Sequence, residues 1–502
     1  MKYVIAYDLG TSSIKASVVD SNTNVIESAV KETHTFSDSN GIREQRPEEW
    51  KSALIEVTNK LLEKFPYPDK IECISISGHS LGVVAIDDRN NLLIDKTPIW
   101  SDERAKKEAD SFFEKVDYEK WYEQTGNGFT RQLYSVFKIM WYKNNNPEVY
   151  SNTKTFLGTK DYLNMILTGR VCTDHSYASG SGVYILKQRK YNVDYIKIAG
   201  LKETDFPEIV ESSEVIGTLT KEISKILGLP ETVKVVGGGV DNACMSLGAG
   251  CIGDGDVYVS LGTSSWIAVA SQTADVDFKK KIYTWAHCVP NTYLPSSGIF
   301  SACSSLEWVI NNLFKELPKE ERYNIFNKMA EECDYKANEV YFCPVMSGGS
   351  YVDVSPDMKG GFMNIDLATT KDQIARATLE GIALELNLSL KALSSITTLS
   401  NQILFVGGGA ESSIWLDIFA NVFNKEIIKG KNSRNAATIG AAALAFVGLN
   451  IWKDYSMLKK PNENVKTHTP NCEDVEFYCK KMEKFIKVCE AHAQIYQYCR
   501  RG

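Results

Sequence analysis

The pentapeptide Leu-Gly-Thr-Ser-Ser occurs twice in the chain, at residues 9–13 and 261–265. Each copy follows one short apolar run that reads as a strand and precedes another. Glycine lets a ligand approach the backbone, and the N–H groups and hydroxyls of such a turn are phosphate donors. A single turn of this kind also forms for reasons of turn geometry alone. Two copies in the same setting favour paired phosphate loops in an internally duplicated protein over a chance repeat.

Asp241 follows a glycine cluster at 237–239, between a predicted strand at 233–236 and an apolar helix. Phosphoryl transfer to a hydroxyl needs a carboxylate that accepts the proton, together with donors and a metal that neutralise the phosphates. We predict that Asp241 is this base, with an ordinary helix N-cap as the alternative. Asp8, at the start of the first loop, is predicted to hold Mg²⁺ directly or through water.

A second run of three glycines, 407–409, follows a predicted strand at 402–405 and precedes a predicted helix at 414–423. A strand–glycine–helix junction suits a flat ligand that lies on the backbone, such as a nucleotide base or ribose, although a plain tight turn has the same composition. No Walker sequence GxxxxGK[ST] is present. The pattern therefore points to a phosphate site of a different type.

The elements that must position these residues alternate between strands and helices along 502 residues. A helix is predicted at 47–65, and strands at 71–77 and 82–86. A chain of this length predicts two large domains.

Composition excludes several functional classes. The net charge is -7, and no basic cluster interleaved with aromatics is present, so a nucleic-acid surface is not expected. No signal-peptide pattern and no apolar run long enough to span a bilayer is found. The twelve cysteines are scattered, which predicts reduced, mostly buried thiols in a cytoplasmic protein. Four of them lie in a helical-looking tail and are predicted to be packing residues: Cys472, Cys479, Cys489 and Cys499.

Taken in order, the motifs resemble those of the FGGY carbohydrate kinase family, within the sugar-kinase/actin/heat-shock ATPase superfamily. The resemblance runs through almost the whole chain. The matching segments are DLGTSS at 8–13, SGHSLGVVAID at 77–87, PIWSDERA at 98–105, TKDYLNMILTGRVCTDHSYASGSG from 159, GGGVDNACMSLGAG at 237–250, SLGTSSW at 260–266, RATLEGIA at 376–383 and GGGAESSIWLDIFANV at 407–422.

The resemblance implies an α/β fold with two duplicated actin-like (ribonuclease H-like) domains flanking a catalytic cleft. Residues 1–245 would form the sugar-binding domain with the first phosphate loop, and 246–455 the nucleotide-binding domain. Residues 456–502 would form a helical tail packed on the second domain. The implied activity is ATP-dependent phosphorylation of a sugar hydroxyl, with ATP and Mg²⁺ as cofactors.

Site residues carry over where this sequence matches the family's motifs. Asp241 matches the catalytic base, and Asp8 with Asp241 forms the metal-associated pair. The residues expected to contact nucleotide are Asp8, Gly10, Thr11, Ser12, Ser13, Lys15, Gly262, Thr263, Gly408, Gly409, Ala410 and Ser413. Those expected to contact sugar are His79, Ser80, Leu81, Trp100, Asp102, Asp241 and Asn242.

Departures from the family pattern bear on the substrate. Ser80 and Leu81 stand where xylulokinases carry Met-His and glycerol kinases carry Arg-Glu. Glycerol is disfavoured because its charged clamp is missing. We expect a pentulose such as D-xylulose; another ketose, an aldonate or a short polyol (ribulose, gluconate, erythritol) is the alternative. Leu81 turning into the core, with Ser80 capping the turn, is the competing interpretation of this pair.

Two further departures concern the nucleotide site. Residues 347–350 lack the Glu-Arg pair of many members, and Asn421 stands where Asp is common. A non-catalytic actin-like ATPase or sugar sensor is the alternative from another class, and the presence of Asp8 and Asp241 favours the kinase. The expected partners are sugar and ATP, with no nucleic acid and no membrane, and a homodimer is allowed for.

Overall fold

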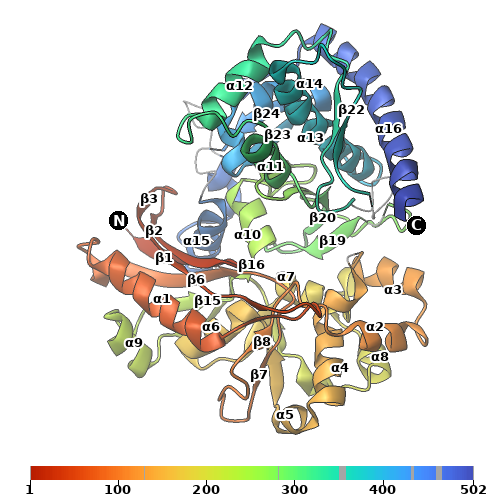
Figure 1. The fold of residues 1–502 in the computed structure, drawn as a ribbon. Coiled ribbons are helices and arrows are strands. Elements are labelled where there is room, and N and C mark those ends of the chain that lie inside the picture. Colours follow the sequence, from red (N-terminus) through yellow and green to blue (C-terminus); the bar gives the residue numbers. More distant parts are fainter. Residues whose placement is uncertain are drawn as a thin grey trace.

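In a computed structural model of the chain, the described residues are 2–128, 130–280, 282–349, 358–430, 435–459 and 466–500. Ser350, the last residue of the segment 347–350 that departs from the family pattern, lies outside these ranges. Two mixed sheets, each covered by helices, lie one above the other with α10 (Asp241–Gly248) and α15 (Ala436–Gly448) between them (Figure 1).

The first sheet has the strand order β14-β15-β6-β1-β2-β3, with the short β16 also paired to β6. Its strands are β1 (Tyr3–Leu9), β2 (Ser13–Asp20), β3 (Val25–Glu32), β6 (Ile71–Gly78), β14 (Val215–Thr218), β15 (Lys234–Val236) and β16 (Gly239–Val240). β1 pairs antiparallel with β2 and parallel with β6. The first Gly-Thr-Ser loop is therefore the turn between β1 and β2.

The second sheet has the order β19-β20-β18-β17-β23-β24-β25. Its strands are β17 (Val257–Leu261), β18 (Ser265–Val269), β19 (Tyr283–Ala286), β20 (Tyr293–Ile299), β23 (Gln402–Val406), β24 (Glu426–Lys429) and β25 (Thr467–His468). The series β20-β18-β17-β23-β24 repeats β3-β2-β1-β6-β15 in order and strand direction. The predicted duplicated α/β architecture is confirmed.

Alternation along β1 gives the first sheet two buried faces. Ile5 and Tyr7 point to α1 (Pro47–Leu62) and α6 (Thr159–Thr168), and all of them lie in one hydrophobic cluster. Val4 and Ala6 point to the opposite face, which α10 and α15 cover. Helix α15, nearly 200 residues beyond this sheet in the chain, thus completes its core (Figure 1). The domain division expected at 245 falls inside α10.

Residues 81–206 add an aromatic-rich lobe beside the first sheet, at the lower right of Figure 1. Its helices are α2 (Lys106–Phe113), α3 (Tyr118–Thr125), α4 (Ser135–Asn145), α5 (Pro147–Asn152), α7 (His175–Ala178) and α8 (Val193–Ile198), and α9 (Lys221–Leu227) follows. The short strands of the molecule are β4 (Phe36–Ser37), β5 (Arg43–Gln45), β7 (Val84–Ile86), β8 (Thr97–Pro98), β9 (Thr155–Leu157), β10 (Cys172–Asp174), β11 (Tyr184–Ile185), β12 (Lys190–Tyr191), β13 (Glu208–Val210), β21 (Tyr341–Cys343) and β22 (Gly361–Met363).

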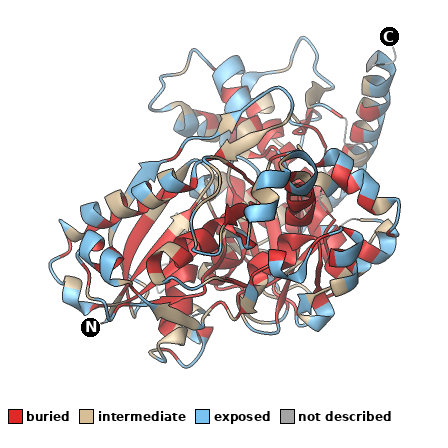
Figure 2. Ribbon diagram, turned by 90° about the horizontal axis from the view of Figure 1, so that it is seen from below, coloured by how far each residue is buried: buried red, intermediate tan, exposed pale blue. Residues whose placement is uncertain are grey.

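Helices around the second sheet are α11 (Cys303–Leu313), α12 (Arg322–Glu332), α13 (Lys371–Ser394), α14 (Ser413–Phe423) and α16 (Cys472–Arg500). The buried side chains of α16 recur every three or four residues, as expected of one helix face: Tyr478, Met482, Phe485, Cys489 and Ala493. Much of the rest of α16 is exposed (Figure 2). The packing role predicted for the tail cysteines was therefore wrong for Cys472, Cys479 and Cys499, which are exposed because they miss this face.

All twelve cysteines are free thiols, and eight of them are buried. Within the described ranges, no helix combines the length and the apolar character needed to cross a bilayer.

Candidate active site

Both Gly-Thr-Ser loops close on a single backbone hydrogen bond. The N–H of Gly10 donates to the carbonyl of Ser13 (2.9 Å), and that of Gly262 donates to Ser264 (3.1 Å). A side chain at Gly262 would meet only the Ser264 oxygen, at 3.6 Å, so open space lies above this glycine. Thr263 is exposed beside it. The second loop thus presents hydroxyls and unfilled space at a strand end, whereas a Cβ at Gly10 of the first loop would lie 3.3 Å from the Ser13 oxygen.

The second loop packs against the start of α11 and the glycine run that follows β23. Cys303 N–H donates to the Gly262 carbonyl (3.0 Å). Gly407 has φ +97, and a Cβ there would lie 2.6 Å from the Leu261 oxygen. Gly409 is equally close to Leu261, whereas Gly408 has no atom within 4 Å of its Cβ position. Three of the glycines predicted to contact nucleotide, Gly262, Gly408 and Gly409, therefore lie together around Leu261.

Two other predicted nucleotide contacts are engaged within the protein. Ala410 is buried, and the Ser413 hydroxyl accepts a hydrogen bond from Lys466 Nζ (2.8 Å). Asn421 accepts from the Asn471 N–H just before α16 (2.8 Å), which is a structural contact.

Asp8 and Asp241 bring two carboxylates from different elements to the same cleft. Asp8 lies on β1 and accepts a hydrogen bond from Ser77 Oγ (3.0 Å). Lys15 lies opposite Asp8 on β2, and its Nζ donates to Asn435 Oδ1. Asp241 begins α10, where the Asn242 N–H donates to its Oδ1 (2.7 Å). Burial, and after it the charge of Asp8, raises the pKa of Asp241 to about 7. Burial likewise raises the pKa of Asp8.

A cavity lies beside Asp241, lined by residues of both halves of the chain. The lining residues are Ser80, Ser176, Val240, Asn242, Ala243, Trp266, Ala268, Trp285, Ala286, Leu294 and Ser296. Ser80 and Asn242 were predicted sugar contacts. The indole nitrogens of Trp266 and Trp285 are buried and have no hydrogen-bond partner among the described residues. Two N–H donors from the second sheet are therefore left for a ligand.

His79 is fully buried next to this cavity wall, edge-on to Trp50 with ring centroids 5.6 Å apart. Neither ring nitrogen has a partner in the described part of the chain. Burial, and then the charge of Lys138, lowers the pKa of His79 to about 3, so the imidazole is neutral at physiological pH.

Ser80 and Leu81 point in different directions. Ser80 lines the cavity, but Leu81 packs in the aromatic-rich lobe with its side chain 3% exposed. Its φ of +61 makes the sharp turn that separates the two side chains. The core alternative for Leu81 matches this placement.

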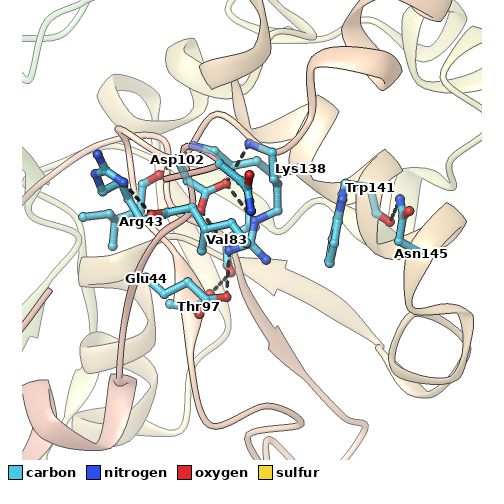
Figure 3. Close-up of polar contacts among 12 residues, drawn as sticks. Arg43, Glu44, Val83, Thr97, Asp102, Lys138, Trp141 and Asn145 are labelled. Atoms are coloured by element: carbon cyan, nitrogen blue, oxygen red, sulfur yellow. Dashed lines mark hydrogen bonds and ion pairs between the residues drawn. The ribbon is translucent and has the colours of Figure 1, made fainter. Parts of the chain in front are cut away.

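The polar groups of Trp100 and Asp102 are taken up by the protein. Trp100 Nε1 donates to Thr11 Oγ1 (3.0 Å). Asp102 accepts from Arg104 Nε and from the Arg43 N–H, each at 2.7 Å (Figure 3). The polar atoms of these two residues are therefore bound within the protein instead of being offered to a ligand.

Lys138, which sequence reasoning missed, lies in the same network (Figure 3). Its ammonium donates to the carbonyls of Leu81, Ile99 and Leu133 at 2.8–2.9 Å. The sequence signal that could have identified Lys138 is its position as a single lysine within the apolar run VFKIMWY. Trp285, by contrast, belongs to no motif that the sequence displays.

Comparison with known proteins bears on this geometry. The model of the FGGY family of carbohydrate kinases matches residues 3–248 with its N-terminal domain and residues 257–449 with its C-terminal domain. The chain is 30% identical over 452 residues to a xylulose kinase of Staphylococcus xylosus, covering 89% of this chain and 91% of that one. It is 25% identical over 497 residues to a gluconokinase of Bacillus licheniformis, covering 97% and 96%. A solved structure described as a xyloylose kinase from Brucella ovis superposes with a TM-score of 0.89 at 25% identity, covering 98% of this chain and all of that one.

Proposed function

Because the chain belongs to the FGGY family of carbohydrate kinases and is thus an ATP-dependent sugar kinase, we propose that its substrate is a pentulose such as D-xylulose. The observation that carries this proposal is the cavity beside Asp241, whose polar lining is neutral. Relatives named xylulose kinase at 30% identity support the same substrate.

Neutral hydroxyl, amide and indole groups suit a ligand whose polar atoms are hydroxyls and a carbonyl. None of the described residues that line the cavity is Lys or Arg. The carboxylate of an aldonate would therefore lose hydration without gaining a charged partner. This argument favours a ketose over gluconate, although a gluconokinase is among the relatives.

Asp241 is proposed as the catalytic base. The substrate hydroxyl oxygen forms a bond to the γ-phosphorus of ATP, the bond from that phosphorus to its bridging oxygen breaks, and ADP leaves. The hydroxyl proton passes to a carboxylate oxygen of Asp241. A carboxylate with a pKa of about 7 suits this task because proton acceptance is efficient near the working pH.

The two Gly-Thr-Ser loops are proposed to hold the phosphates from opposite sides of the cleft. Gly10, Thr11, Ser12 and Ser13, with Lys15 behind them, would act from the first sheet. Gly262 and Thr263 would act from the second, with Gly408 and Gly409 under the adenosine. The open space above Gly262 and Gly408 supports this assignment.

Mg²⁺ is proposed to accompany ATP and to be held by Asp8 and Asp241. The two carboxylates fit the ion, because both are half-buried and the charge of Asp8 acts on Asp241 and raises its pKa. When bound, the ion would neutralise phosphate charge. No cluster of three or more metal-ligating side chains exists among the residues that the structure describes.

We retain the expected domains as part of the proposal, namely 1–245, 246–455 and the tail 456–502. A cytoplasmic setting is proposed as well, since ATP is available there and all the cysteines are free thiols. The homodimer stays a prediction.

The test is steady-state ATP turnover with D-xylulose, D-ribulose, gluconate, erythritol and glycerol. We expect the highest kcat/KM with a pentulose. A preference for gluconate or glycerol would overturn the substrate assignment but leave the kinase activity intact. Asp241→Asn should lower kcat by about 10²-fold or more while ATP still binds.

A further inference from the structure

A buried charged cluster lies behind the Asp241 loop, and of the relay residues named next only Ser176 also lines the cavity described above. We propose that Lys160, Asp174 and Ser176 form a positioning relay that sets the backbone of Asp241. This inference rests on the proposed role of Asp241 as the base. The relay connects the start of α6, the end of β10 and the start of α7 to residues 237–240.

Lys160 anchors the relay at one end. Its side chain is fully buried, and its Nζ lies 2.9 Å from Asp174 Oδ1 in an ion pair. The same Nζ donates to the Gly237 carbonyl (3.1 Å), which also accepts from Asn164 Nδ2 (2.9 Å). Two side chains of one helix thus hold the first residue of the Asp241 loop.

Ser176 completes the relay at the other end. Its hydroxyl donates to Asp174 Oδ2 (2.5 Å) and accepts from the N–H of Val240 (2.9 Å), the residue immediately before Asp241. A hydroxyl has one proton. Because that proton is committed to Asp174, a lone pair of Ser176 Oγ is directed at Val240. Ser212 Oγ also donates to Asp174 Oδ2 (2.8 Å), so the carboxylate itself is fixed.

The loop has little room to move away from these contacts. Gly238 has φ +70, and a Cβ there would lie 2.2 Å from the Ile76 carbonyl oxygen on β6. At Gly239 a Cβ would lie 3.3 Å from Ser176 Oγ. The backbone of the loop is therefore packed directly on the relay and on the sheet.

The start of α6 also holds the sugar loop. Thr159 Oγ1 donates to the His79 carbonyl (2.6 Å), and Lys160 Cβ lies 2.8 Å from where a Cβ of Gly78 would be. Consecutive residues thus fix the loop that faces the sugar and the loop that carries the base. Their relative position sets the distance between the substrate hydroxyl and Asp241, and an error near 1 Å costs about 10²-fold in rate.

Ser176→Ala removes the relay hydroxyl and is the first variant to make; because Ser176 also lines the cavity, the KM for D-xylulose is measured beside kcat. Ser224→Ala is the control, because Ser224 is also a buried helix serine with a donating hydroxyl, but it lies on α9 and donates to the Leu229 carbonyl (2.6 Å) instead of to a carboxylate. Both substitutions are made in the wild-type chain and in Asp241→Asn. The measurements are turnover with D-xylulose and ATP, and calorimetric binding of D-xylulose and of ATP to each variant.

We expect Ser176→Ala to lower kcat roughly tenfold, with the KM for ATP unchanged within about twofold and Ser224→Ala at wild-type turnover. In the Asp241→Asn background Ser176→Ala should have no further effect, since a positioning residue acts only through the group it positions. Asp174→Asn should show the same non-additive pattern.

If Ser176→Ala lowers kcat equally in the wild-type chain and in Asp241→Asn, Ser176 acts on the fold and the relay is overturned. Wild-type turnover of Ser176→Ala would overturn the relay as well. If Asp241→Asn alone keeps full turnover, the base assignment fails, which is a separate result read from the single variant.

Discussion

Gly262 is the position at which the second phosphate loop leaves open space. Its missing Cβ has ordinary clearance and its φ is not in the left-handed region, so Gly262→Val should fold normally. The valine branches would occupy the space assigned to phosphate. We expect the KM for ATP to rise about tenfold or more, while calorimetric sugar affinity and Tm stay near wild type. Gly262→Ala should give a smaller rise, and equal losses of sugar and ATP affinity would contradict the assignment.

Trp285 lines the cavity, and we expect its buried, unpartnered indole N–H to donate to the sugar. Trp285→Phe keeps an aromatic ring and removes the donor, so it should cost about 1 kcal/mol of sugar binding, roughly a fivefold rise in the KM for D-xylulose. The KM for ATP should not change. Trp452→Phe is the control, because Trp452 Nε1 donates to the Ser21 carbonyl (3.0 Å) instead of facing the cavity. An unchanged sugar KM in Trp285→Phe would remove Trp285 from the site.

His79 makes stability depend on pH. Its folded pKa of about 3 lies below the unfolded value near 6.5, so between these pH values the unfolded chain binds a proton that the folded chain does not. The stability is therefore complete above pH 6.5 and falls on acidification, by about 2 kcal/mol at pH 5 from this residue. His79→Gln should lose correspondingly less stability between pH 7 and 5 in urea titrations. His34→Gln, at an exposed histidine, should retain the wild-type loss.

The sequence predicted the residues at the cavity more successfully than it predicted the roles of Trp100 and Asp102. Asp241 was identified from the glycine cluster at 237–239, and Ser80 and Asn242 from the family resemblance; the structure places Ser80 and Asn242 in the lining of one cavity, with Asp241 next to Asn242 at the start of α10. Trp100 and Asp102 were expected to offer polar atoms to the sugar. Their partners, Thr11 and Arg104, follow from tertiary packing that a motif does not record.

Helices α10 and α15 cross at two glycines, and this contact is an element-scale constraint on the site. A Cβ at Gly440 would lie 1.8 Å from the Cys244 carbonyl oxygen, so Gly440→Ala forces the helices apart. We expect a loss of about 1–3 kcal/mol in stability and a lower kcat, because α10 begins with Asp241. Gly430→Ala is the control, since its nearest neighbour is 3.5 Å away. Wild-type stability of Gly440→Ala in urea titrations would contradict the crossing.

Strands and helices were predictable where apolar runs end at glycine or proline. The helix predicted at 47–65 is observed at Pro47–Leu62, and the strand predicted at 71–77 at Ile71–Gly78. The elements that α15 packs against could not be predicted, because its sequence is apolar on every side and does not indicate which face meets which neighbour.

At the scale of the whole molecule, the two halves share one core. The cluster that contains Val4 and Ala6 of β1 also contains Leu444 and Phe446 of α15. A fragment of residues 1–248 would keep α10 but lack α15, and would leave much of that face of the first sheet uncovered. We expect the fragment to be insoluble or to bind a hydrophobic dye, and co-expression with residues 249–502 to restore solubility. A soluble, dye-negative fragment with a cooperative unfolding transition would contradict a shared core.

Helix α15 also sets a delay during synthesis. The ribosome completes the first sheet with β16 at Val240 but adds α15 only from Ala436 onward. At about 5–20 residues per second, roughly 10–40 s pass before the sheet's second face can be covered. The newly made chain spends that interval with an apolar surface open to other chains, so its yield should depend on chaperones that shield such surfaces more than its final stability would indicate.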